Sequence, residues 1–272
     1  MKYLCVFDLD DTLLSADKTV SSENLEALRK LRDLDVGISI ATGRSIFMTG
    51  LYVELLSLNI PVITCNGAVL VSADRKHVIY ENPIEKSLIT RLFIYLLDQR
   101  ADFIAYTNQT VYYSKDSIRV NIFKGYNKSV PAAIQAPLQV FSLRNFEEDN
   151  PDIVKILLYS PTPEQESYLK GINGLEVLSS GENFLDIMQE GSTKGNAVRA
   201  LGRYMDIPVE NIAVFGDNEN DVSMFTCGAL SIAMANSRDD IKEKARFVTG
   251  SNRESGVAAG IYKYVLPYFD MG

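Results

Sequence analysis

The sequence predicts an α/β protein with a doubly wound parallel-sheet core and an inserted α+β cap domain. Three observations predict this fold. Strand and helix patterns alternate in the first and last thirds of the chain, whereas the middle third shows strands in hairpin-like pairs. Acidic, hydroxyl and lysine residues follow the predicted strands of the outer thirds, as they do where parallel strands form a ligand site at one edge of a sheet.

The first third of the chain reads as strand, helix, strand, helix, strand. Residues 2–7 form a short run that is apolar and aromatic after Lys2, which predicts a buried strand. Residues 21–35 predict an amphipathic helix with Ser21 or Ser22 as its N-cap. The leucines of this helix recur every three residues: Leu25, Leu28, Leu31 and Leu34. Residues 36–41 and 61–65 predict two further strands, with a helix between them.

The pattern changes after Gly67. Residues 68–71 and 77–80 flank a polar turn and predict a hairpin. Further on, we expect helices at 84–99 and 163–171 and strands at 103–107, 111–114, 153–160, 175–178 and 184–188, with a helix or loop between residues 115 and 152. Paired strands with helices to one side indicate an α+β module inserted into the first domain.

From Ser192 the alternation resumes. We expect helices at 193–205 and 237–244 and strands at 212–215, 230–234 and 247–249. Residues 1–83 and 187–272 are therefore predicted to form one Rossmann-like core, with residues 84–186 as the cap.

Composition narrows the classes of function. The net charge is −8 without a dense Lys/Arg stripe, which disfavours nucleic acid as a partner. Three isolated cysteines, no signal-peptide core and no apolar run of membrane-spanning length predict a cytoplasmic protein. His77, in a polar turn, is the single histidine, so a serine or cysteine nucleophile would depend on it. We therefore expect the chemistry to rest on carboxylates, lysine and a metal.

The chemical residues follow the predicted strands. They are Asp8, Asp10, Asp11 and Thr12 after the first strand, Thr42, Gly43 and Arg44 after the second, and Asp217 to Asp221 after the strand at 212–215. Lys194 begins the helix at 193–205. Carboxylates at such an edge suit Mg²⁺, which prefers hard oxygen ligands. A carboxylate beside such a metal can attack phosphorus, while lysine and hydroxyl groups stabilise the phosphoryl oxygens.

Four segments, taken together and in order, resemble the haloacid dehalogenase superfamily, and most closely its Cof-type phosphatases with a C2-type α/β cap. They are FDLDDTL at residues 7–13, ATGR at 41–44, KG at 194–195 and GDNEND at 216–221. The resemblance spans nearly the whole chain and is weakest between residues 84 and 185. It implies hydrolysis of small phosphorylated metabolites, such as sugar phosphates, with Mg²⁺ as cofactor.

The resemblance also implies roles for individual residues. Asp8 would be the nucleophile and a magnesium ligand, and Asp10 the general acid/base, whose carbonyl oxygen also binds the metal. Asp217 would be a further ligand, supported from behind by Asp221 and Asn218. Lys194 would neutralise the phosphate and orient Asp8. The remaining phosphate contacts would come from Leu9, Asp10, Thr42, Gly43 and Asn220. Arg44 is interpreted as an ion-pair partner outside the catalytic set.

The resemblance implies that the inserted cap contacts the leaving group of the substrate and so selects among substrates. Its candidate contacts are Arg119, Asn121, Lys124, Lys128, Arg144, Tyr106, Tyr112, Tyr113 and Tyr126, although each residue type occurs more often at surfaces or in cores. An alternative enzyme is a sugar phosphomutase or phosphotransferase that uses the same intermediate. A non-enzymatic phospho-aspartate regulator and an inactive binding protein of the same fold are further alternatives. Asp10 and the large insert argue against the regulator, and the intact set of Asp8, Asp10, Lys194 and Asp217 argues against the binding protein.

Overall fold

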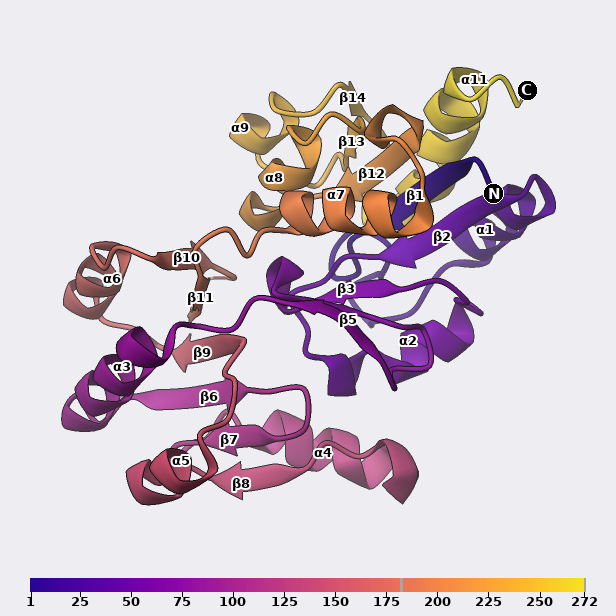
Figure 1. The fold of residues 1–272 in the computed structure, drawn as a ribbon. Coiled ribbons are helices and arrows are strands. Elements are labelled where there is room, and N and C mark those ends of the chain that lie inside the picture. Colours follow the sequence, from indigo (N-terminus) through magenta and orange to yellow (C-terminus); the bar gives the residue numbers. More distant parts are fainter. Residues whose placement is uncertain (182, 272) are drawn as a thin grey trace.

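The computed structural model describes residues 1–181 and 183–271, and its core is a five-stranded parallel sheet in the order β14-β13-β12-β1-β2 (Figure 1). The strands are β1 (Tyr3–Phe7), β2 (Val36–Ile40), β12 (Ile212–Gly216), β13 (Leu230–Ala233) and β14 (Phe247–Val248). Phe7 pairs with Ile40 on one side and with Phe215 on the other. The residues that follow these strands therefore lie next to one another.

Alternating residues of β1 face two different layers of helices. Leu4 and Val6 pack in the cluster that contains Val198 and Leu201. Cys5 and Phe7 pack in the cluster that contains Leu28, Leu31 and Val257. One layer consists of α7 (Lys194–Met205), α8 (Val222–Phe225) and α9 (Asp239–Lys242), and the other includes α1 (Ser22–Asp33) and α10 (Gly256–Gly260). Because both faces are covered, the strands are largely apolar, and the predicted doubly wound core is confirmed.

A small three-stranded sheet continues from β2. It consists of β3 (Val62–Thr64), β4 (Val69–Val71) and β5 (Val78–Glu81), and α2 (Gly50–Leu55) precedes it. The hairpin between β4 and β5 is confirmed. The strand expected at 61–65 touches the parallel sheet only through the bridge between Ala41 and Ile63, and it pairs antiparallel with β4. The reason is a sharp reversal of the chain, in which Cys65, Asn66 and Gly67 all have positive φ.

The cap contains a six-stranded sheet in the order β10-β11-β9-β6-β7-β8. Its elements are α3 (Lys86–Asp98), β6 (Asp102–Tyr106), β7 (Val111–Tyr113), α4 (Asn121–Ser129), β8 (Leu138–Val140), α5 (Leu143–Asp149), β9 (Lys155–Tyr159), α6 (Pro163–Lys170), β10 (Leu175–Ser179) and β11 (Phe184–Gln189). Phe103, Ile156 and Leu185 face a cluster built with α3 and α5. Ile104, Tyr106, Leu157 and Met188 face the core domain.

Sequence patterns missed several short elements. The chain between residues 115 and 152 was expected to be a helix or loop, but it forms α4, β8 and α5. The expected boundary between residues 186 and 187 falls inside β11, all of which belongs to the cap sheet. After β14 the chain continues through α10, a π-helical turn at Ile261–Val265 and α11 (Leu266–Tyr268), which the sequence interpretation left unassigned.

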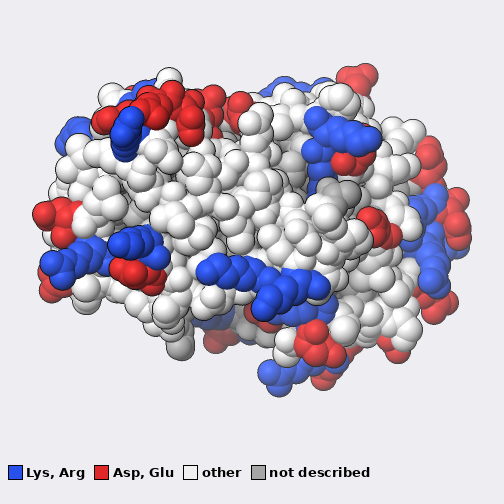
Figure 2. All heavy atoms as spheres, turned by 90° about the horizontal axis from the view of Figure 1, so that it is seen from below, with Lys and Arg blue, Asp and Glu red and all other residues white. Residues whose placement is uncertain are grey.

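On the face seen from below, basic and acidic side chains lie beside one another around a broad uncharged area (Figure 2). In the part of the chain that the structure describes, no helix has both the length and the apolar character needed to cross a membrane.

Candidate active site

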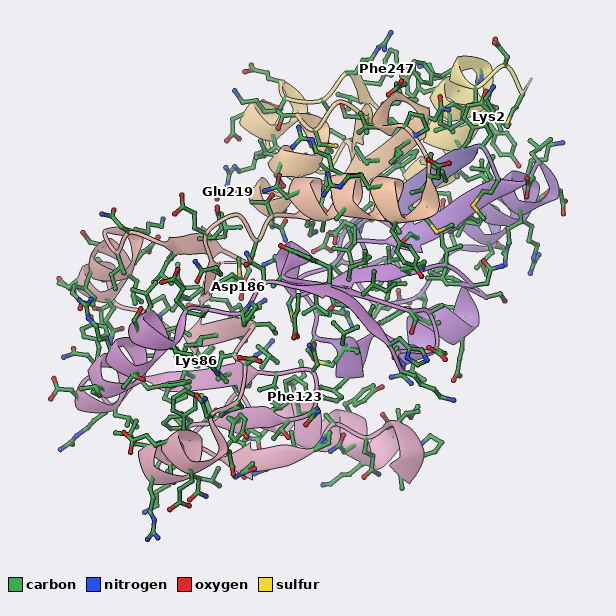
Figure 3. The ribbon with its side chains drawn as sticks, viewed as in Figure 1. Lys2, Lys86, Phe123, Asp186, Glu219 and Phe247 are labelled. Carbon is green, nitrogen blue, oxygen red and sulfur yellow. The ribbon has the colours of Figure 1, made fainter. Side chains whose placement is uncertain are left out.

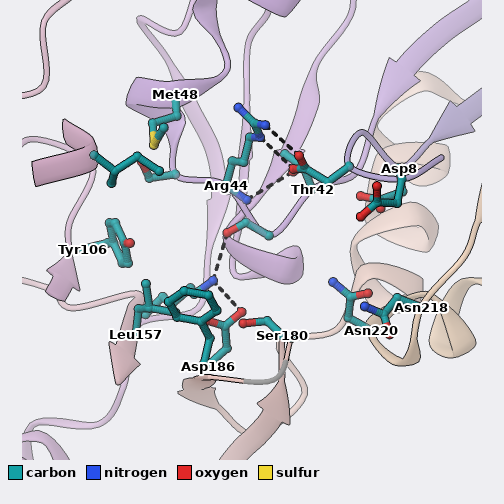
Figure 4. Close-up of a pocket in the computed structure, with 18 of the residues that line it drawn as sticks. Asp8, Thr42, Arg44, Met48, Tyr106, Leu157, Ser180, Asp186, Asn218 and Asn220 are labelled. Atoms are coloured by element: carbon teal, nitrogen blue, oxygen red, sulfur yellow. Dashed lines mark hydrogen bonds and ion pairs between the residues drawn. The ribbon is translucent and has the colours of Figure 1, made fainter. Parts of the chain in front are cut away.

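The residues that follow β1, β2 and β12 line one cavity of about 530 Å³ between the core and the cap. Asp8 follows β1 directly, Thr42 and Gly43 follow β2, and Asp217 follows β12. In Figure 4, Asp8, Asn218 and Asn220 lie on one side of this cavity, and Tyr106 and Leu157 lie on the other. The residues that the sequence places after separate strands therefore lie together at one edge of the sheet.

Lys194 joins two of the carboxylates. Its Nζ donates hydrogen bonds to Asp8 Oδ1 at 2.7 Å and to Asp221 Oδ1 at 2.6 Å, and its side chain is 0% exposed. Burial alone would lower the pKa of Lys194, but the charges of Asp221 and Asp8 outweigh burial and raise it. The lysine is therefore a permanent cation between two buried carboxylates.

Two glycines allow α7 to begin at this position. Thr193 caps the helix by accepting a hydrogen bond from the N–H of Asn196 at 3.2 Å. A Cβ on Gly195 would lie 2.0 Å from the carbonyl oxygen of Ser223, and a Cβ on Gly67 would lie 2.2 Å from that of Thr193. Both contacts are with backbone that lacks a flexible end, so these close approaches require glycine.

Asp8, Asp217 and Asp221 form a cluster of acidic groups in which one carboxylate oxygen from each residue lies within 4.8 Å of the others. Both oxygens of Asp221 are engaged, Oδ1 by Lys194 and Oδ2 by the backbone N–H groups of Asp217 at 2.8 Å and Asn218 at 3.1 Å. Asp217 Oδ1 accepts a hydrogen bond from the Thr12 hydroxyl at 2.7 Å. Among the described residues, Oδ2 of Asp8 and Oδ2 of Asp217 accept no hydrogen bond.

The charges of this cluster favour a bound cation. Burial raises the pKa of Asp8, Lys194 opposes that rise, and the carboxylates of Asp221 and Asp217 add to it. Burial and then the charge of Asp221 raise the pKa of Asp217 to about 7. Three carboxylates thus share one lysine, and the two free oxygens are hard donors of the kind that Mg²⁺ prefers. The residues present fit a divalent cation.

Asp10 lies in an ion-pair cluster at the edge of the cavity. Its carboxylate accepts hydrogen bonds from Arg44 Nε at 2.8 Å, Arg44 Nη2 at 2.7 Å and Lys18 Nζ at 2.8 Å. Burial would raise the pKa of Asp10, but Arg44 and then Lys18 outweigh burial and lower the pKa to about 2. Arg44 therefore forms an ion pair, as expected, and in this arrangement Asp10 is an ionised carboxylate.

The other predicted phosphate contacts differ in their surroundings. Thr42 is buried and its hydroxyl accepts a hydrogen bond from the N–H of Arg44 at 3.2 Å. Leu9 has a fully buried side chain, so only its backbone could contact a ligand. Asn220 Nδ2 donates to Asn66 Oδ1 at 3.0 Å, and Asn218, which was expected to support the metal ligand Asp217, caps the following turn with its Oδ1.

Two of the nine candidate cap residues, Tyr106 and Arg119, line the cavity. Arg119 stacks on Phe184 with its guanidinium 4.4 Å from the ring centroid. Tyr112 packs instead in the far cluster of the cap, Lys124 lies over Tyr113, and Arg144 pairs with Glu148. Of the other candidates, Asn121, Lys128 and Tyr126 are also absent from the lining.

The sequence interpretation did not include four residues that line the cavity or contact its lining: Lys18, Lys155, Asp186 and Asn66. Lys155, Asp186 and Lys18 line the cavity, and Asn66 contacts two lining residues, Asn220 and Asp186. A signal existed for two of them, because Lys155 interrupts the apolar run at residues 153–158 and Asp186 interrupts the apolar residues of β11. Lys18 carried no such signal, because it stands in a polar turn where lysine is ordinary.

The model of the haloacid dehalogenase-like hydrolase family matches residues 5–261. The chain is similar to the Escherichia coli pyridoxal phosphate phosphatase YbhA, with 28% identity over 95% of this chain and 97% of YbhA. It is also similar to the Bacillus subtilis 5-amino-6-(5-phospho-D-ribitylamino)uracil phosphatase YwtE, with 29% identity over 95% of this chain and 96% of YwtE.

Solved structures show the same architecture. A haloacid dehalogenase-like hydrolase from Bacillus subtilis matches with a TM-score of 0.83 and 26% identity, covering 97% of this chain and 100% of the other. A protein from Thermotoga maritima matches with a TM-score of 0.78 and 28% identity, covering 97% of each chain.

Proposed function

The chain belongs to the haloacid dehalogenase-like hydrolases, and we propose that it is a magnesium-dependent phosphatase that hydrolyses small phosphate monoesters through an aspartyl phosphate on Asp8. The observation that carries this proposal is the link from Asp8 through Lys194 to Asp221, next to Asp217. Lys194 uses Asp8 Oδ1 at 2.7 Å, which leaves Oδ2 on a side chain that lines the cavity. One oxygen is thus held in position while the other is available as a nucleophile.

The reaction proceeds in two displacements. Asp8 Oδ2 attacks phosphorus and forms an acyl-phosphate bond, while the bond from phosphorus to the leaving oxygen breaks. Protonated Asp10 transfers its proton to that oxygen, and the alcohol departs. Asp10, now a carboxylate, takes a proton from water as the water attacks phosphorus, and the bond from phosphorus to Asp8 Oδ2 breaks, which releases inorganic phosphate and restores Asp8. Asp10 must leave Arg44 for the first step, because it is ionised while paired with it.

Oδ1 of Asp8, which keeps a lone pair beside its hydrogen bond from Lys194, Oδ2 of Asp217 and the carbonyl oxygen of Asp10 would hold Mg²⁺, and Oδ2 of Asp8 would remain for phosphorus. When bound, the ion neutralises charge between the nucleophile and the phosphoryl oxygens. Asp221, both of whose oxygens are engaged, and Asn218 would hold the Asp217 loop in place. Thr42, Gly43, Asn220, Lys194 and the backbone of Leu9 and Asp10 would surround the phosphoryl group.

The substrate class is a small phosphorylated metabolite such as a sugar phosphate or a phosphorylated cofactor. The cavity of about 530 Å³ lies between two domains and suits a compact leaving group. Two similar proteins are named as phosphatases of pyridoxal phosphate and of a phosphoribitylamino-uracil, which supports a ring-bearing metabolite as well as a sugar.

Phosphate release from a panel of sugar phosphates, nucleotides, flavin mononucleotide and pyridoxal phosphate, with Mg²⁺ or with EDTA, tests the proposal. We expect turnover only with Mg²⁺, and none in Asp8→Asn. Mass spectrometry of quenched reactions should detect a phosphorylated protein that Asp8→Asn does not form. Turnover that persists in Asp8→Asn would refute the mechanism.

A further inference from the structure

One charged pair lies on the face that the cap sheet turns toward the core. Lys155 in β9 and Asp186 in β11 are 4% and 0% exposed, and Lys155 Nζ is 2.6 Å from Asp186 Oδ2. The rest of this face is largely apolar and includes Ile104, Leu157 and Met188. Figure 3 shows Asp186 where the cap meets the core. A buried ion pair does not by itself indicate added stability, because desolvation of both groups opposes their attraction.

The further partners of this pair belong to the core domain. Lys155 Nζ also donates a hydrogen bond to the carbonyl oxygen of Gly43 at 2.9 Å (Figure 4). Asp186 Oδ2 accepts a second hydrogen bond from Asn66 Nδ2 at 2.7 Å. Asn66 Oδ1 in turn accepts from Asn220 Nδ2 at 3.0 Å. We call these five residues, Gly43, Asn66, Lys155, Asp186 and Asn220, the cap–core network.

The chemistry of the side chains fixes which atom donates and which accepts in each hydrogen bond from Asn220 through Asn66 to Asp186. Only the amide nitrogen of Asn66 can donate to the carboxylate of Asp186, so the amide oxygen of Asn66 must face Asn220. Asn220 must then present its own nitrogen to Asn66, and the second N–H of that nitrogen remains for another acceptor. Gly43 packs against the same asparagine, since a Cβ at Gly43 would lie 2.9 Å from Asn66 Oδ1.

We propose that Lys155 and Asp186 are positioning residues of the cap that hold Gly43 and Asn220 in the conformation that binds the phosphoryl group. This inference rests on the proposed function, which assigns phosphate contacts to Gly43 and Asn220. Lys155 fixes the peptide that follows Gly43, and Asp186 orients Asn220 through Asn66. The opposite charges of Lys155 and Asp186 largely cancel. The pair therefore positions the phosphate-binding groups and adds little net electrostatic attraction for phosphate. The phosphate site is therefore complete only when the cap lies against the core as it does here.

Binding of inorganic phosphate tests this role without a leaving group. Calorimetric titration in Mg²⁺ would compare the wild type with Asp186→Asn and Lys155→Met. We expect each variant to bind phosphate about 10- to 100-fold more weakly, the loss that corresponds to one hydrogen bond to a charged group. We expect kcat/KM to fall by a similar factor for a sugar phosphate and for pyridoxal phosphate, because the network touches phosphate-binding groups and not the leaving group.

The control is an exposed ion pair of the same domain. Lys86 and Asp152 are 2.9 Å apart with side chains 44% and 54% exposed. Lys86→Met should bind phosphate as the wild type does. The double variant Lys155→Met/Asp186→Leu replaces the pair with apolar side chains, a change that leaves folding intact in other buried pairs. It should keep the thermal midpoint of the wild type or exceed it, and still bind phosphate weakly.

Two results would overturn the inference. One is wild-type phosphate affinity in a folded variant, which would make the pair merely structural. The other is a loss of kcat/KM confined to one ester, which would make the pair a leaving-group contact. A wild-type protein that neither binds nor releases phosphate would instead refute the proposed function, and this inference with it.

Discussion

Replacing Lys194 by methionine should destabilise the core and abolish most of the activity. Lys194 is 0% exposed and lies 2.7 Å from Asp8 Oδ1 and 2.6 Å from Asp221 Oδ1. Methionine has a similar length but no charge, so two carboxylates would lose their cation. Breaking a buried ion pair by removing one partner costs about 3–5 kcal/mol. Most of this cost should come from Asp221, which is 0% exposed, because Asp8 retains contact with the cavity.

Thermal unfolding in EDTA measures the effect without a contribution from metal. For chains of this size, 1 kcal/mol corresponds to roughly 2–4 °C, so the midpoint should fall by about 6–20 °C. Adding Asp221→Asn to Lys194→Met removes the most deeply buried unpaired charge. That double variant should recover about 1–3 kcal/mol, the usual coupling between residues in direct contact.

The control is Lys170, which pairs with Glu166 at 2.6 Å with side chains 48% and 35% exposed. Lys170→Met should cost less than about 1 kcal/mol, since water screens an exposed pair. A Lys194→Met protein that loses no more stability than Lys170→Met would refute the reasoning from burial. In folded Lys194→Met protein, phosphate release should be slower by about 10²- to 10³-fold, the loss seen when one preorganised donor is removed.

Three further predictions concern the metal, the start of α7 and the acid/base. Asp217→Asn should raise the thermal midpoint in EDTA, because it relieves the repulsion among three carboxylates. Mg²⁺ should raise the midpoint of the wild type but not that of Asp217→Asn. A variant whose midpoint rises with Mg²⁺ as much as that of the wild type would exclude Asp217 as a ligand. Gly195→Ala should lower the free energy of unfolding in urea by about 1–3 kcal/mol, because its Cβ would lie 2.0 Å from the Ser223 carbonyl oxygen. Gly125→Ala in α4, where a Cβ would meet open space, should raise that free energy by up to about 1 kcal/mol. Equal effects of the two substitutions would contradict this packing. Asp10→Asn should slow hydrolysis of the aspartyl phosphate, so that quenched mass spectra show more phosphorylated protein than the wild type gives; an unchanged amount would remove Asp10 from that step.

The fold class could be predicted because the burial of helix and strand faces leaves regular patterns of apolar residues in the sequence. Strands buried on both faces read as apolar runs, and α1 shows buried positions such as Leu28 and Leu31 on one side. Short elements such as β8 were missed, because three residues are too few to establish a period. The reversal at residues 65–67 was also missed, although the dipeptide Asn66-Gly67 is a turn signal; the positive φ of Cys65 has no such signal in residue type.

For the candidate site, the sequence by itself determined which residues follow which strands. That was enough to bring Asp8, Thr42, Lys194 and Asp217 together, since the ends of parallel strands share an edge. The proposed roles of these residues still await the assays above.

Only the tertiary structure decided which side chains pair. The partners Asp10 and Arg44 lie 34 positions apart, and Asn66 and Asp186 lie 120 positions apart. No local period links such positions. Asp10 and Arg44 meet because β1 and β2 are neighbours in one sheet, whereas Asn66 and Asp186 meet because the cap sheet lies against the core. Lys155 and Asp186 appeared in the sequence only as charges within apolar strands. They became partners because β9 and β11 are neighbours in the cap sheet, on the face that this sheet presses against the core.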